Sequence, residues 1–171
     1  MDSYLERLRQ ELEEIMTAAG AEHLDKGPAG KWTSAQVLEH LFLTYRATNA
    51  GIAKCLEKGA PLGTQVTLFH RVGALLVVNA GYFPRGRKSP ERAVPKGMPS
   101  EQVRQGILPE IDRMDVGLEQ CEQKFGECAR ILDHPMLGPF SVWQWRKFHW
   151  VHGRHHARQI RERLVKGLSK A

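Results

Sequence analysis

The feature that most constrains the fold of this chain is the spacing of its apolar residues, which recur every three or four positions in four long stretches. These stretches cover residues 4–18, 32–59, 100–127 and 141–166. Such spacing is typical of amphipathic helices, and no stretch shows the alternation of a half-buried strand. Four long helices in 171 residues predict an all-α, four-helix bundle that forms a single domain over residues 1–171.

Capping residues indicate where these helices begin and end. Thr33 can cap the second helix, with Gln36 three residues later as its reciprocal partner, and Gly59 can end that helix. Ser141 and Gln144 repeat the capping pattern before the last helix. We therefore expect helix boundaries at these positions.

The connection between the second and third helices, about residues 59–99, is long. It is expected to contain a shorter extra helix at about 66–80, and its length lets the two helices that it joins run parallel. Within the third helix, Pro109 predicts a kink or a break. The segment DHPMLGPF, residues 133–140, is rich in turn residues and is expected to be a connector.

The net charge of +6 raises nucleic acid as a partner, but the charge is sorted along the chain. Residues 1–25 carry seven acids against two arginines, and residues 146–171 carry eight bases against one acid. Complementary faces of the first and last helices explain this distribution better than a nucleic-acid groove does. A second basic run, residues 84–96, has no interleaved aromatic residues for base stacking. Nucleic-acid binding is therefore not expected.

The sequence also predicts a soluble, cytoplasmic protein. Its charged first residues do not resemble a signal peptide, and its best apolar run, GALLVVNAGYF, is too short to span a bilayer, so no membrane association is expected. The three cysteines, Cys55, Cys121 and Cys128, cannot all pair within one chain. Reduced thiols are the simple interpretation.

Histidines are concentrated in the last predicted helix, where residues 149–164 hold four of the eight in the chain. His152 and His156 are one helical turn apart, about 40° from each other around the axis, on a face shared with the aromatic Trp145. This spacing lets two imidazoles reach one metal ion from a single helix. His149 and His155 flank the pair. A pair of this kind can also lie near solvent without a ligand.

A third candidate ligand, His40, lies among apolar residues of the second helix. A lone histidine on an apolar face is more often a core residue, but a metal ion needs at least one ligand beyond the pair. The residues that continue the His40 stripe are small, where a bundle core normally has Leu or Ile. We therefore expect them to line a substrate pocket beside the metal; they are Thr44, Ala47, Thr48 and Gly51.

Two segments, KWTSAQVLEHL and HPMLGPFSVWQWRKFHWVHGRHHARQI, resemble the DinB-like (YfiT-like) superfamily, and more narrowly a branch described only as a domain of unknown function. The family pattern is a histidine in the second helix and H-x-x-H-H-x-x-Q-I in the last. The matching positions here are His40, His152 and His156, with His155 and the QI pair at 159–160 also in place. The resemblance implies an up-down-down-up bundle, often dimeric, with a divalent metal held by the three histidines.

Three neutral ligands would leave Zn²⁺, Ni²⁺ or Fe²⁺ its full charge and an open position. The resemblance implies an enzyme that uses such an ion to activate water or a low-molecular-weight thiol, as a hydrolase or a thiol S-transferase acting on a small molecule. No general base stands out: Glu39 points about 100° away from His40, and His149 and His155 are the nearest weak candidates for a catalytic role. The alternative is a non-catalytic bundle in which a metal is structural or absent.

Other features carry weaker expectations. The histidines in or near connectors, His23, His70 and His134, are not expected to be ligands. The loop GYFPRGRK, residues 81–88, overlaps the start of the basic loop at 85–96. It could cover the pocket mouth and offer arginines to an anionic substrate, or it could simply be solvated.

Two tryptophans, Trp143 and Trp150, lie on the face of the last helix opposite the metal stripe, near Val165 and Leu168. If both were exposed, they would form an apolar patch that promotes association, so we expect another surface to pack over them. The long connection could supply it, but a second copy of the chain in a homodimer is slightly favoured because tryptophan is enriched at interface centres.

Overall fold

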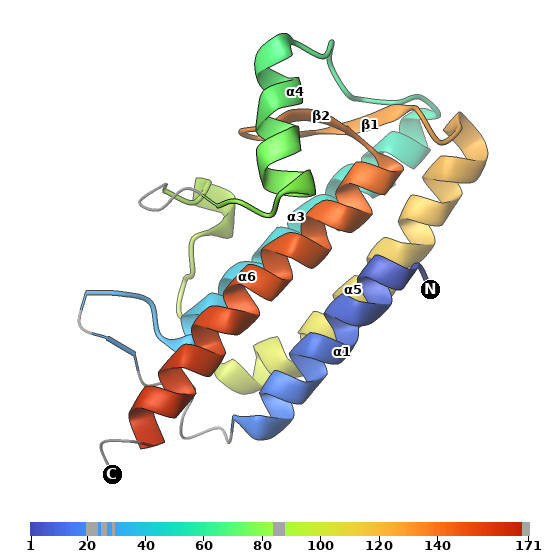
Figure 1. The fold of residues 1–171 in the computed structure, drawn as a ribbon. Helices are drawn as coiled ribbons and strands as arrows, with labels where there is room; N and C mark the ends of the chain where they lie inside the picture. Colours follow the sequence, from blue (N-terminus) through green and yellow to red (C-terminus); the bar gives the residue numbers. More distant parts are fainter. Residues whose placement is uncertain (20–23, 25–26, 29, 84–87, 169–171) are drawn as a thin grey trace.

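The computed structural model describes residues 1–19, 24, 27–28, 30–83 and 88–168 and is mostly α-helical (Figure 1). The long helices are α1 (Ser3–Ala18), α3 (Ser34–Lys58), α5 (Ser100–Phe125) and α6 (Val142–Leu168). The shorter elements are α4 (Leu68–Ala74), the π-helical turn η1 (Leu75–Asn79), the 3-10 turn η2 (Glu91–Ala93), and the strands β1 (Arg130–His134) and β2 (Gly138–Ser141).

The four long helices lie side by side, with α3 packed mainly on α5 and α1 mainly on α6. Figure 1 shows α3 and α5 running in the same direction, while α1 and α6 run the opposite way. The apolar stripe of each helix faces the shared interior. The stripe of α1 is fully buried, as its spacing predicts; it consists of Leu5, Leu8, Leu12 and Ile15.

Local signals set the helix boundaries as expected. Thr33 and Gln36 form a reciprocal capping box at the start of α3, and Gly59 ends the helix in the left-handed region at a φ of 67°. Ser141 and Gln144 exchange the same pair of hydrogen bonds before α6. The long connection contains α4 and η1, close to the predicted 66–80.

One expectation for the second half of the chain needs correction, and another is settled only in part. Of the kink or break expected at Pro109, the break does not occur, because α5 runs through the proline as one element. The segment predicted as a connector instead contributes to an antiparallel hairpin of β1 and β2, in which Leu132 pairs with Phe140. The chain that follows α3 adds to the hairpin, since the amide of Leu62 donates to the carbonyl of Ile131. Long-range pairing therefore produces strands that the local sequence did not predict.

The acidic first helix and the basic last helix form ion pairs with each other. Arg161 of α6 forms ion pairs with Glu11 and Glu14 of α1, as complementary faces predict. Arg146, also on α6, lies 2.7 Å from Glu122 of α5. Among the described helices, none has the length and apolar character needed to cross a membrane.

Candidate metal centre

Three histidine side chains from two helices meet in the interior between α3 and α6. The Nε2 atom of His152 lies 3.4 Å from Nε2 of His40 and 3.1 Å from Nε2 of His156. Ligands arranged tetrahedrally at 2.0–2.1 Å from one zinc ion would be about 3.3 Å apart. Both separations match those of ligands on one metal ion, and the ligand atoms of the three histidines all lie within 4.8 Å of one another, so the group could hold an ion.

The ring of His40 is oriented by a backbone carbonyl that lies far from it in the sequence. Its Nδ1 is 2.7 Å from the carbonyl oxygen of Ala93 in η2. Because a carbonyl oxygen can only accept, Nδ1 carries the proton and the lone pair of Nε2 faces the other histidines.

Glu39, which the sequence placed about 100° from His40, holds the loop that supplies this carbonyl. Its carboxylate is almost fully buried and accepts hydrogen bonds from the backbone amides of Lys96 and Gly97, at 2.6 and 3.1 Å. These charge-assisted bonds fix the chain just after η2. Glu39 therefore acts through Ala93 on the orientation of His40.

Gln159 has the corresponding role for His156. Its Oε1 lies 3.0 Å from Nδ1 of His156, and its Nε2 lies 3.0 Å from Nε2 of His155. The amide therefore accepts from the first ring and donates to the second, which directs Nε2 of His156 towards the centre. The ring of His152 is held by packing instead, because it stacks on Phe148 with the planes 13° apart.

Burial keeps the three rings in the neutral form that binds metals. It lowers the pKa of His156 to about 3 and the pKa of His152 well below its usual value, with the charges of neighbouring histidines adding to both shifts. The pKa of His40 is also lowered by burial, against the opposing effect of the Ala93 carbonyl. Within the described residues, no carboxylate contributes to any of these three shifts. An ion held here would therefore keep its charge.

Two aromatic side chains that the sequence analysis did not select form walls of the centre. Trp32 lies against His40 with a ring separation of 5.2 Å. Phe83 lies 5.7 Å from His152 and stacks on His155 at 4.9 Å. Phe83 belongs to the loop expected to cover the pocket. The two arginines of that loop, at 85 and 87, lie outside the described residues, so the role expected for them stays a prediction. The only signal for Trp32 was its place next to the capping box.

Among the small residues of α3 that were expected to line a pocket, Gly51 lies against the hairpin, and the pocket role of the others stays a prediction. The Thr44 hydroxyl donates to the carbonyl of His40 at 2.8 Å, and the Thr48 hydroxyl donates to the carbonyl of Thr44 at 3.1 Å. A Cβ at Gly51 would lie 2.9 Å from Cδ1 of Leu132, so the space expected there is filled by the hairpin. Ala47 is half-buried. A close helix–hairpin contact therefore accounts for Gly51.

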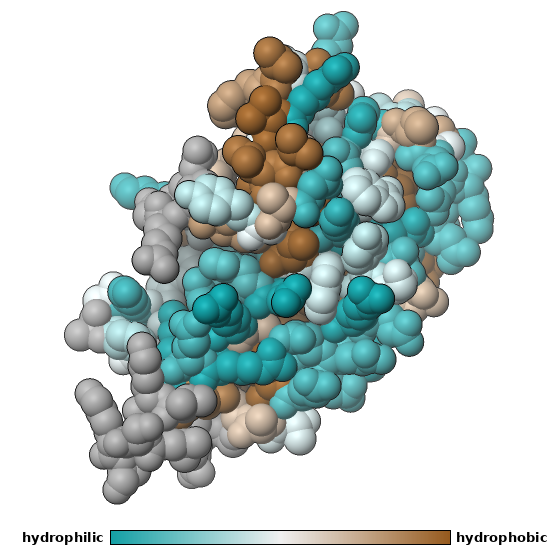
Figure 2. Space-filling model, viewed as in Figure 1, coloured by the Kyte–Doolittle hydropathy of each residue, from teal (hydrophilic) through white to brown (hydrophobic). Residues whose placement is uncertain are grey.

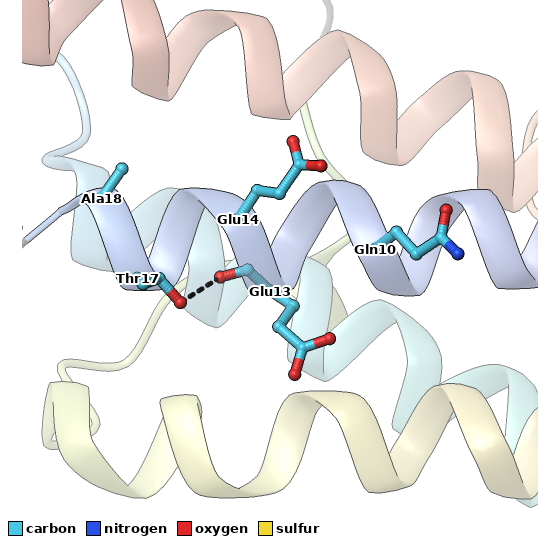
Figure 3. A pocket seen from close by; sticks show the side chains of 5 residues that line it. All are labelled: Gln10, Glu13, Glu14, Thr17 and Ala18. Carbon is cyan, nitrogen blue, oxygen red and sulfur yellow. Dashed lines mark hydrogen bonds between the residues drawn. The ribbon is translucent and has the colours of Figure 1, made fainter.

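Two surface hollows of the described part of the chain lie away from the three converging histidines. Figure 3 shows one whose lining comes from a single helix, α1, where the Thr17 hydroxyl donates to the carbonyl of Glu13. Another is lined by residues of the η2 region and the β1 end, including Arg92 and Asp133. Neither contains a metal-ligating cluster.

The two weak catalytic candidates have different surroundings. His149 is completely buried, stacked on Trp145 and in edge contact with Tyr45, and burial lowers its pKa to about 3. His155 is half-buried beside the centre and touches both Phe83 and Gln159. The position of His155 suits a proton-transfer role, whereas His149 belongs to the core.

The other histidines that were not expected to be ligands either form local hydrogen bonds or lie outside the described residues. His70 caps α4 together with Thr67, and His134 accepts hydrogen bonds from the amides of the turn between β1 and β2. His23 lies outside the described residues. The three cysteines are free; Cys55 and Cys121 are buried, while Cys128 is exposed.

A family model for a protein of unknown function, DUF1569, matches residues 5–163, a span that includes all three converging histidines. No curated protein and no solved structure matches the chain.

Proposed function

This chain belongs to the DUF1569 family, and we propose from its site that it is a metal-dependent enzyme of hydrolase or thiol S-transferase type. His40, His152 and His156 would hold a divalent ion such as zinc, nickel or iron. The observation that supports this most directly is the convergence of their three Nε2 atoms. The substrate would be a small molecule, with a low-molecular-weight thiol as a possible co-substrate.

The divalent ion, when bound, would supply the Lewis acidity that makes water or a thiol nucleophilic at neutral pH. The protein contributes the rest. Ala93 and Gln159 keep the protons of two ligand rings on Nδ1, so that the rings do not need to change tautomer when they bind the ion. Trp32 and Phe83 restrict access of water to the centre. His155 is close enough to exchange a proton with a molecule bound there.

We also propose that the chain is a DinB-like four-helix bundle with up-down-down-up order. The parallel course of α3 and α5 supports this order, as does the long connection that links them. The pattern of His40 in one helix and H-x-x-H-H-x-x-Q-I in another supports the same assignment. This proposal is independent of the reaction that the site performs.

Metal content and coordination test the proposed activity. Purified protein should contain one equivalent of metal per chain. The His40→Ala variant should lose this metal while its circular dichroism spectrum shows that it remains folded. His155→Ala is the matched control, because His155 lies beside the centre but is not one of the converging ligands; it should retain metal. Metal in the His40→Ala variant equal to wild type would refute the assignment of ligands.

A second measurement separates an enzyme from the alternative of a non-catalytic bundle with a structural metal. Structural sites are closed by protein ligands, whereas catalytic sites keep a position that small molecules can occupy. Adding 2-mercaptoethanol to cobalt-loaded protein should produce a sulfur-to-cobalt charge-transfer band. A bound cobalt ion whose spectrum does not respond to thiol or azide would favour the structural alternative.

A further inference from the structure

The segment α4–η1 exposes an unusual amount of apolar surface. Five large side chains project from it with 47% to 77% of their surface exposed, and Figure 2 shows them as a continuous brown area over α4. We call these residues the outer apolar face; they are Leu68, Phe69, Val72, Leu75 and Leu76. Monomeric proteins rarely leave a contiguous patch of this kind in water.

The opposite side of the same segment is apolar as well. Ala74, Val77 and Val78 are buried, and η1 packs against α6. A helix that is apolar on both sides is typical of a buried element. One side is buried by the chain itself, so the exposure of the other side indicates that another surface covers it.

We infer that the outer apolar face is covered by the same face of a second copy, in a two-fold dimer. The five side chains expose on the order of 500 Å², so two faces would bury roughly 1,000 Å², which is about the minimum for a biological interface and is typical of a weak dimer. A single stripe along one short segment can pair with itself across a two-fold axis, because each residue meets its symmetry-related neighbour.

Charge favours a protein surface over a lipid surface as the cover. An interfacial membrane helix carries a row of basic residues on the side that faces water. In α4–η1 that side is packed on α6, and Arg71 is the only Lys, Arg, Asp or Glu between Leu68 and Asn79. Depletion of charge is characteristic of the centre of a protein interface.

The outer apolar face also continues towards one of the tryptophans expected at an interface. Lys147 lies 3.5 Å from the side-chain oxygen of Asn79, at the end of η1, and 4.8 Å above the ring of Trp143. Trp143 is 40% exposed, whereas Trp150 is partly buried against the core. The structure thus centres the interface on α4–η1 with Trp143 at its border; the side chains of Val165 and Leu168 lie outside the described residues.

The test is the oligomeric state of a variant that places charge on this face. Phe69→Glu combined with Leu75→Glu should convert a dimer into a monomer in sedimentation at micromolar concentration. Val116→Glu is the matched control, since Val116 is a similarly exposed apolar residue (54%) on α5 and should leave the dimer intact. Circular dichroism of each variant should match wild type, because exposed positions tolerate a charge.

Other outcomes overturn the inference. A wild-type monomer at micromolar concentration, or a dimer that survives both glutamates in a folded variant, would show that a second copy does not cover this face. Sedimentation with vesicles of phosphatidylcholine and phosphatidylglycerol provides the remaining arm. A wild-type monomer that binds vesicles through this face would assign it to a lipid surface instead.

Discussion

Replacing His149 with leucine should make the stability of the protein less sensitive to acid. The ring of His149 is fully buried between Trp145, Tyr45 and Phe148, and neither ring nitrogen has a hydrogen-bond partner among the described residues. Burial lowers its pKa to about 3, against 6.5 in an unfolded chain. Leucine has a similar volume and no titratable group, so the substitution removes the proton uptake with little change in packing.

The expected magnitude follows from proton linkage. Below pH 6.5 the unfolded chain takes up a proton at this position and the folded chain does not. The contribution of this histidine to the free energy of unfolding is therefore fully present above pH 6.5 and is lost as the pH falls. The loss is about 1 kcal/mol per pH unit per histidine as long as the folded pKa stays below the pH. Six histidines have a lowered pKa, namely His40, His134, His149, His152, His155 and His156, and the folded pKa is about 4 for His134 and about 3 for His149 and His156.

Together His134, His149 and His156 should cost the wild-type protein up to about 3 kcal/mol per pH unit, which is a large part of the total stability of a domain. Urea unfolding at pH 7.5, 6.5 and 5.5, with a chelator present to remove metal linkage, measures this slope. His149→Leu should reduce it by about 1 kcal/mol per pH unit. A wild-type stability that does not change over this range, or an identical slope in the variant, would refute the reasoning.

Four further predictions concern residues of α3 and α6. Gln159→Leu removes the acceptor that orients His156 and should weaken zinc affinity by roughly 10–100-fold, as measured by competition with a chromophoric chelator; unchanged affinity would contradict this role. Gly51→Ala should change the stability by less than about 1 kcal/mol in urea unfolding, because the methyl end of Leu132, which the new Cβ would meet at 2.9 Å, can shift and alanine is the better helix former. Ala47→Leu should obstruct ligand entry with little loss of stability. Glu39→Gln should cost about 2 kcal/mol by weakening two charge-assisted hydrogen bonds to the loop after η2, and a stability equal to wild type would show that the loop is held by other contacts.

The sequence by itself determined the features that depend on neighbouring residues. Helix periodicity and caps are local, so the boundaries at Thr33, Gly59 and Ser141 could be read directly. The one-turn spacing of His152 and His156 also follows from helix geometry alone. That His40 approaches them depends on how α3 and α6 pack. The indications of it in the sequence were the apolar surroundings of His40, the small residues on its stripe and the resemblance to the DinB-like histidine pattern.

The tertiary structure decided the features that join distant segments. The hairpin forms because β1 pairs with β2 and also bonds to the chain that follows α3, although the sequence of the hairpin is rich in turn residues. Ala93 reaches His40 across more than fifty residues, and Phe83 meets His155 from a connection whose path no local pattern specifies. The exposure of Leu68 and Phe69 was also decided by the tertiary structure. An apolar helix is exposed or buried according to which elements pack on it, and this depends on the whole fold rather than on the residues of the helix.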